Sequence, residues 1–446
     1  MSALQEPLPR AAIDAKFASI LATSAVAFGI LLSGFVIREP APYELYMAAL
    51  IGIWALFGLR IPAAIVPMLV LLVVFNIGGM ISMLTMSDIG GIPLYLAVSL
   101  FLALTAVFFA SATAADPGLY RVIFLAYVVA AVATSALGVL GYFHAFPGAE
   151  MFTLYDRAAG AFQDPNVFGP FLTLPGIYLL HRLMTGRTAM MPVLAVPLLV
   201  IVGGIFFSFS RGAWGLFAVS AVLLVAALFI QTSSGMLRLR IVVMTIAGLA
   251  LLVLALLVML QIPAVADLFL ARAQLVQEYD GARLGRFARH AIGFLLAMEH
   301  PLGIGPLLFG QLYGEDTHNI WLKALLDYGW LGFAAYLTLI MWTLAGGFRI
   351  LFRDRPWQPY LLCAYVVFVG HVGLGTVIDT DHWRHFYLLL GLIWGAMALE
   401  AGHQRRSRAP VRTAATRQQR QSSKSPLRRN SEAYRASRGP ECSAAR

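Results

Sequence analysis

Arg211 stands where two long apolar runs meet, in the segment Phe207–Trp214 with the sequence FSFSRGAW. A turn this short between two membrane spans leaves the arginine at the membrane interface, pointing outward as a snorkelling anchor or into the protein. A guanidinium so close to hydrocarbon is costly unless an anion pairs with it. The small neighbours Ser208, Ser210 and Gly212 leave room for a ligand. The pattern therefore favours anion binding by Arg211.

A second cationic group lies in the segment Arg283–Pro301, which has the periodicity of an amphipathic helix. Arg286, Arg289 and His290 fall on one face of that helix, together with Gly293, and apolar residues fall on the opposite face. A cationic face at a membrane surface suits a lipid-linked phosphate or diphosphate. It equally suits an interfacial helix whose arginines only contact lipid head groups, and the pattern alone does not decide between the two.

Three further polar segments adjoin apolar runs. Asp164 or Asn166 can cap a helix with Pro165 in its first turn. His318 lies at the mouth of another run, where a histidine is either a hydrogen-bonded cap or a proton-transferring group. The segment 379–385 holds acidic and basic side chains, which either bind sugar hydroxyls or pair internally.

The composition identifies an integral membrane protein, because 60% of the residues are hydrophobic and only 12% are charged. Twelve of the 32 Lys and Arg and two of the 22 Asp and Glu lie in residues 401–446, so this tail carries the whole net charge of +10. Its polarity predicts disorder. Nucleic-acid binding is a poor interpretation, because the tail lacks a fold and interleaved aromatic residues. Cys363 and Cys442 predict neither a disulfide nor a metal cluster.

About twelve apolar runs are long enough to span a membrane, which predicts an all-α polytopic membrane protein. An even number places both chain ends on one side, and the basic tail makes that side cytoplasmic. We expect residues 1–400 to form the transmembrane domain, with one long periplasmic loop at about 263–318, and residues 401–446 to form a cytoplasmic tail. The polar segments described above then share the outer side. The predicted spans are 17–36, 43–59, 61–79, 92–112, 121–143, 166–182, 191–209, 212–231, 241–262, 319–345, 360–378 and 385–400.

Four of these segments, in this order, resemble the bacterial O-antigen ligase and O-antigen (exopolysaccharide) polymerase superfamily. The matching sequences are AFQDPNVFG, SFSRGAWGLF, GRFARHAIGFLLAMEHPLGIGP and THNIWLKALLDYGWLGFAAYL, between about Gly160 and Leu337. The first five spans match in hydropathy alone. The family usually has an aromatic residue where this chain has His290. The segment DTDHWRHFYLLLGLIWG is similar to what polymerases for secreted polysaccharide carry.

The resemblance implies a glycosyltransferase at the periplasmic face of the bacterial inner membrane. The donor would be a glycan on undecaprenyl diphosphate, and the acceptor would be a sugar hydroxyl on another lipid-linked repeat unit or, for a ligase, on the lipid A core. No cofactor and no metal ion are expected in this family. Membrane lipids, and a chain-length regulator or a flippase, would be further partners, whereas nucleic acid would not.

The resemblance also assigns roles to residues of this chain. Arg211 and Arg286 match the family's arginines and would stabilise the diphosphate leaving group. His318 matches its histidine and would position or deprotonate the acceptor hydroxyl, or contact the donor. Substrate-binding side chains are expected at four further positions, namely Arg289, Asn166, Asp316 and Asp164.

Two other classes of protein stay open. A secondary transporter or a lipid-linked oligosaccharide flippase also has about twelve spans, but it usually carries charge at the bilayer midplane. Here Lys323 and Asp327 are almost alone inside the predicted spans, and their spacing allows them to pair. A non-catalytic assembly partner would tolerate loss of the arginines. The clustering of polar groups at one membrane face favours an enzyme.

Overall fold

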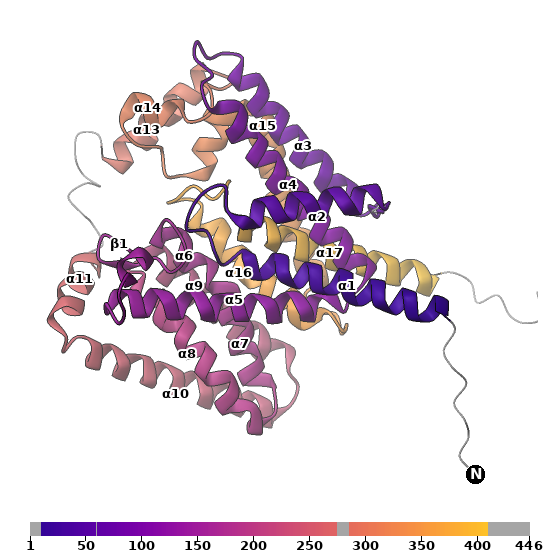
Figure 1. Cartoon of the computed structure of the whole chain (residues 1–446), viewed down its shortest axis with the longest axis vertical. Coiled ribbons are helices and arrows are strands. Elements are labelled where there is room, and N and C mark those ends of the chain that lie inside the picture. The colour runs from indigo at the N-terminus through magenta and orange to yellow at the C-terminus, as the bar shows by residue number, and fades with distance from the viewer. Residues whose placement is uncertain (1–9, 59, 274–284, 409–446) are drawn as a thin grey trace, which may run out of the picture. The chain divides into compact units, whose positions relative to one another are not determined.

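The computed structural model describes residues 10–58, 60–273 and 285–408 (Figure 1). The described chain is almost entirely helical and contains one hairpin of two short strands, β1 (Thr153–Leu154) and β2 (Arg157–Ala158). This confirms the predicted all-α class. The chain divides into two units, residues 1–399 and 400–446, and the fold and the site described below belong to the first. Most of the predicted basic tail lies outside the described residues.

Among the described residues, nine helices are long and apolar enough to cross a membrane. The number of spans predicted, about twelve, stays a prediction, although every predicted run overlaps a helix. These nine are α1 (Arg10–Leu32), α3 (Val66–Met83), α4 (Ile92–Ala115), α5 (Leu119–Tyr142), α8 (Met191–Phe207), α9 (Arg211–Gln231), α10 (Gly235–Met259), α15 (Ile320–Ile350) and α17 (Arg384–Arg408). The others described are α2 (Pro42–Leu56), α6 (Pro165–Phe171), α7 (Thr173–Thr185), α11 (Pro263–Ala273), α13 (Arg286–Glu299), α14 (Leu308–Tyr313), α16 (Gln358–Leu374) and the 3₁₀ turns η1 (Ala149–Phe152) and η2 (Thr188–Met190).

The sixth predicted span is divided into α6 and α7, and proline explains the division. Pro175 has no N–H to donate to the carbonyl of Phe171, four residues earlier. That carbonyl accepts a hydrogen bond from the hydroxyl of Tyr127 on α5 instead, at 3.0 Å. The hydroxyl of Tyr127 thus pairs a buried carbonyl that the helix itself cannot pair.

Helices α3 and α15 lie side by side (Figure 1), and glycine makes their close approach possible. A Cβ atom added at Gly78 of α3 would lie only 2.4 Å from the carbonyl oxygen of Tyr328 on α15. The rings of Phe75 and Tyr328 stack on each other with their centroids 3.8 Å apart. This contact fixes the first half of α15, which follows His318 directly.

A kink in α15 holds the end of the long loop. Gly329 has a left-handed backbone (φ 63°) inside the helix. At the kink, Trp330 N donates to the carbonyl of Pro301 and Ile304 N donates to the carbonyl of Leu326, both at 2.9 Å. The chain after α13, from Pro301 to Ile304, is therefore packed against α15.

The amphipathic segment forms α13 and turns its small and polar face toward the protein. Arg289 and Ala297 are buried, whereas Phe294 and Leu295 are 51% and 63% exposed. Gly293 faces Thr317, whose Cγ2 would lie 3.2 Å from an added Cβ. The apolar face is thus exposed among the described residues, which is what an interfacial helix requires.

Candidate functional site

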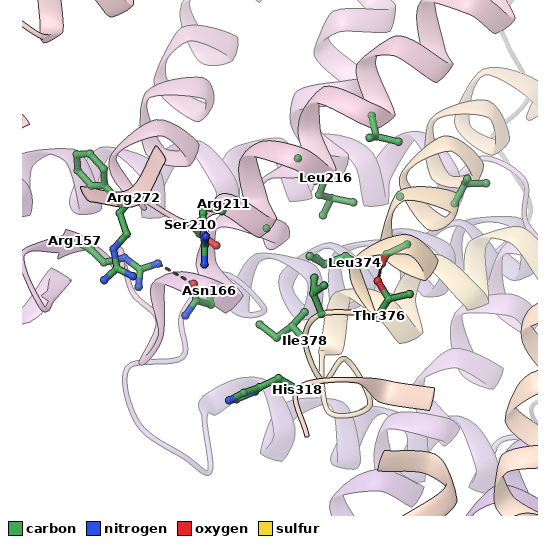
Figure 2. Close-up of a pocket in the computed structure, with 18 of the residues that line it drawn as sticks. Arg157, Asn166, Ser210, Arg211, Leu216, Arg272, His318, Leu374, Thr376 and Ile378 are labelled. Atoms are coloured by element: carbon green, nitrogen blue, oxygen red, sulfur yellow. Dashed lines mark hydrogen bonds between the residues drawn. The ribbon is translucent and has the colours of Figure 1, made fainter. Parts of the chain in front are cut away.

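A cavity of about 790 Å³ opens between α9, α16 and the polar segments that precede them in the chain (Figure 2). One part is lined by polar and cationic side chains, and the other by glycines and aliphatic residues of α9 and α16. The polar lining consists of Arg157, Asn166, Ser210, Arg211, Arg272, His290 and His318, and the remaining lining of Phe209, Gly212, Gly215, Leu216, Val219, Val369, Gly370, Gly373, Leu374, Thr376, Val377 and Ile378.

Arg211 is the first residue of α9 and is half-buried at the rim of this cavity. Ser210 caps the helix, its Oγ accepting a hydrogen bond from Ala213 N at 3.4 Å. Phe209 has a left-handed backbone (φ 44°), which turns the chain sharply between α8 and α9. The guanidinium and the positive end of the helix dipole therefore share one edge of the cavity.

Arg157 is a second guanidinium in the cavity, and the sequence reading missed it. It lies on β2 and is only 5% exposed. Its Nε donates to the carbonyl of Ser208 at 2.7 Å, and its NH2 group donates to Asn166 Oδ1 at 2.8 Å. The sequence signal that could have found Arg157 is its position, nine residues before Asn166 and shortly before the matching segment AFQDPNVFG. Arg272 of α11 adds a third guanidinium.

The predicted residues Asp164 and Asn166 have different contacts in the structure. Asp164 caps α6, with Oδ1 accepting from Asn166 N at 2.7 Å. Asn166 lines the cavity and holds Arg157 (Figure 2). The capping interpretation is thus confirmed for Asp164, and substrate contacts by either residue stay a prediction.

His318 lies on the opposite side of the cavity from Arg211 in Figure 2. Its backbone is left-handed (φ 48°), and its side chain is 38% exposed. Its Nδ1 lies 3.7 Å from Asp379 Oδ2. His290 also lines the cavity, and its Nε2 lies 2.8 Å from the carbonyl oxygen of Thr317. The imidazole of His318 is therefore held at the cavity beside the carboxyl group of Asp379.

Two other predicted residues have partners away from the cavity lining. Arg289 forms an ion pair with Glu315. Asp316 Oδ2 lies 3.1 Å from Lys323 Nζ, which is buried. Substrate contacts by Arg289 and Asp316 stay predictions. For Arg286, the structure describes the backbone at the start of α13 but not the side chain, so its predicted role also lies outside the described residues.

Lys323 joins several carboxylates behind His318. Its Nζ lies 3.9 Å from Asp379 Oδ2 and 4.0 Å from Asp327 Oδ2. The predicted pairing of Lys323 with Asp327 is therefore present. Burial would raise the pKa of Asp381, but Lys323 and His382 outweigh it and hold this pKa below the ordinary value.

Asp381, His382 and Arg384 pair with other residues of the protein, which was one of the two interpretations of segment 379–385. Asp381 Oδ2 accepts from the hydroxyl of Tyr95 at 2.8 Å and lies 3.0 Å from His382 Nδ1. Arg384 forms ion pairs with Glu39 and Glu44. These bonds tie the start of α17 and the residues before it to α4, to α2 and to the segment before α2.

Asp379 should make the stability of the protein depend on pH. Burial raises its pKa to about 7, against the opposing effect of Lys323. Because the folded state holds this proton more tightly than the unfolded state, stability falls as pH rises from about 4 through 7. The side chain of Asp379→Asn stays neutral. The free energy of unfolding of this variant should therefore rise by about 2 to 3 kcal/mol relative to wild type between pH 5 and pH 8.

The check is the thermal unfolding midpoint of the purified protein at pH 5, 6, 7 and 8. We expect the Asp379→Asn midpoint to move above the wild-type midpoint as pH rises, by a few degrees. Asp354→Asn, an exposed carboxyl remote from the cavity, is the control. A difference between Asp379→Asn and wild type that stays constant with pH would contradict the prediction.

Comparison with known proteins extends the resemblance. Residues 196–337 match the protein family described as O-Antigen ligase. The match covers less than half of the chain, from α8 into α15, and it includes Arg211, Arg272 and His318. No curated protein matches the chain. The predicted resemblance is confirmed for this segment, in a protein with several membrane-spanning helices.

Proposed function

We propose, on the premise of the O-antigen ligase match over residues 196–337, that the chain transfers a glycan from polyprenyl diphosphate to a sugar hydroxyl at the periplasmic face of the inner membrane. In this reaction it polymerises the repeat units of an exopolysaccharide or O-antigen. The observation that carries the proposal is the single cavity that joins a cationic end to an apolar end.

The two chemically different parts of the donor match the cationic end and the apolar end of the cavity. An isoprenoid chain would lie against Gly215, Leu216 and Val219 of α9 and the facing residues of α16. Its diphosphate would then meet Arg211 at the beginning of α9. Guanidinium groups bind phosphate oxygens through paired N–H donors. They stabilise the negative charge that grows on the leaving diphosphate as the glycosidic bond breaks.

The acceptor would react from the side of His318. The acceptor oxygen attacks the anomeric carbon, the bond from that carbon to the phosphate oxygen breaks, and the imidazole takes the acceptor proton. Asp379, 3.7 Å from Nδ1, stabilises the imidazolium that forms. The products are the extended glycan and polyprenyl diphosphate.

A ligase that joins the glycan to lipid A core is the second candidate, because the matched family is described by that activity. The donor and its contacts would be the same. Polymerase and ligase differ only in the acceptor.

The test is the size distribution of lipid-linked and cell-surface glycans in a deletion strain. Single repeat units on the outer leaflet, without long chains, are the expected result for a polymerase. Long chains retained on the lipid carrier, with none on lipid A core, would instead identify a ligase. Repeat units trapped on the cytoplasmic leaflet would contradict both and favour a flippase.

Filling the apolar part of the cavity should block donor use. A Cβ atom at Gly215 of α9 meets no other atom within 4 Å, and Gly215 lines the cavity, so the leucine side chain of Gly215→Leu should occupy part of the cavity. We expect glycan transfer to fall by about tenfold or more, since excluded isoprenoid units lose their burial free energy. Transfer is measured in membranes with a lipid-linked donor.

The matched control is Gly248→Leu on α10. Gly248 is also a helical glycine with no atom within 4 Å of an added Cβ, but it does not line the cavity. Both substitutions add the same apolar volume and the same helix propensity. Equal activity in the two variants would remove the apolar half of the cavity from the proposal.

A further inference from the structure

Lys323 lies behind His318, and the two residues face one carboxylate oxygen. The side chain of Lys323 is buried near the start of α15, where the residue is 6% exposed. Asp379 Oδ2 lies 3.9 Å from Lys323 Nζ and 3.7 Å from His318 Nδ1. The same oxygen therefore has an ammonium on one side and an imidazole of the cavity lining on the other.

A backbone hydrogen bond joins the two segments that carry these groups. Ile320 N, at the start of α15, donates to the carbonyl of Gly375, at the end of α16, at 2.8 Å. His318 and Lys323 flank Ile320 along the chain, and Asp379 follows shortly after Gly375. The bond keeps the two segments together, so the backbone supports the position of the shared oxygen.

Carboxyl groups outnumber cations around Lys323. Its Nζ lies 3.1 Å from Asp316 Oδ2 and 4.0 Å from Asp327 Oδ2, in addition to Asp379. The further titratable groups around this cluster, among the described residues, are Asp381, His382, Tyr328 and Tyr95, whose ring centroid lies 5.7 Å from Lys323 Nζ. Without the ammonium, several buried carboxyl groups would lie close together, and like charges favour proton uptake.

We propose that Lys323 is a positioning residue for His318, which acts by holding the Asp379 carboxylate ionised beside the imidazole. The inference rests on the proposed function, in which Asp379 stabilises the imidazolium. It adds a residue that does not line the cavity. Burial raises the pKa of Asp379 to about 7, and among the surrounding groups Lys323 has the largest opposing effect.

Lys323→Met should move the acidic limb of the rate–pH profile of glycan transfer upward by about one pH unit or more, because Asp379 then takes up its proton at higher pH. Transfer should fall by about fivefold or more at pH 7 and return toward the wild-type rate at pH 9. Lys323→Arg keeps the charge and should keep the wild-type profile. Lys16→Met, at an exposed position of α1, is the control for the same substitution.

Asp316→Asn should move the acidic limb in the opposite direction. The charge of Asp316 raises the pKa of Asp379, so its loss should lower the midpoint of the limb by about half a pH unit. This variant keeps Lys323, so it tests the inference even if Lys323→Met fails to fold. An upward shift or an unchanged midpoint in Asp316→Asn would count against the inference.

A double-mutant cycle tests whether Lys323 acts through Asp379. In an Asp379→Asn background, Lys323→Met should change the transfer rate at pH 7 by less than about twofold. The ionisation of Asp379 is followed separately in the purified full-length protein in lipid nanodiscs. The probe is the infrared band of its protonated carboxyl group, identified by its absence in Asp379→Asn, and its midpoint should shift as the rate profile does.

Additive losses in the cycle, or the same infrared midpoint in wild type and Lys323→Met, would overturn the inference. Absence of glycan transfer by wild type would instead overturn the proposed function. The infrared midpoints would then still decide whether Lys323 controls the ionisation of Asp379.

Discussion

Arg211→Lys is expected to lower the rate of glycan transfer by about a hundredfold or more, although it keeps the positive charge. Arg211 begins α9 at the boundary between the cationic and apolar parts of the cavity. A lysine ammonium is a point charge and cannot offer two parallel N–H donors to one phosphate. The loss should be larger in turnover than in donor affinity, because charge on the leaving diphosphate grows in the transition state.

The measurement is the initial rate of chain growth in membranes that contain equal amounts of wild-type and variant protein. Arg238→Lys is the matched control, because Arg238 lies on α10 and does not line the cavity. It donates to the carbonyl of Thr232 and should tolerate lysine. Wild-type rates in Arg211→Lys would exclude Arg211 from the reaction.

His318→Gln should produce the second largest loss, also about a hundredfold or more, with a different kinetic signature. A glutamine amide has hydrogen-bonding groups but no basic nitrogen to accept the acceptor proton. Since donor contacts with the arginines persist, the affinity for undecaprenyl diphosphate should change by less than about threefold. The loss should therefore appear in turnover and not in donor binding.

Both quantities are measured on the same preparation, with His300→Gln as the control. His300 is exposed just after α13 and does not line the cavity. A parallel loss of donor binding and turnover in His318→Gln would make His318 a donor contact and leave proton transfer to another group. Full activity would remove His318 from the mechanism.

The sequence predicted the helices and three of the cavity's polar residues because these features are local. An apolar run, a cap and a short turn between spans are recognisable from neighbouring residues. Arg211 and Asn166 lie in the first turn of a helix, and His318 lies directly before the N-cap of α15, where such local signals are strongest. The break between α6 and α7 also has a local cause in its prolines, and it was not predicted.

Arg157 was missed because its position depends on contacts that no local pattern reveals. The hairpin has only two residues in each strand, so it shows no alternation of polar and apolar residues. Its anchor at Ser208 lies 51 residues further along the chain. Pairing of Arg289 with Glu315, across 26 residues, was unpredictable for the same reason.

On the proposed function, the orientation of α13 would give the bilayer a structural part in the reaction. Phe294 and Leu295 are 51% and 63% exposed in the described structure, whereas His290 on the same helix lines the cavity. A lipid surface against these exposed side chains would then support one wall of the cavity, as a second subunit would in a soluble enzyme. Lipid composition and lateral pressure would then influence the geometry of the cavity, and extraction into detergent would remove this support.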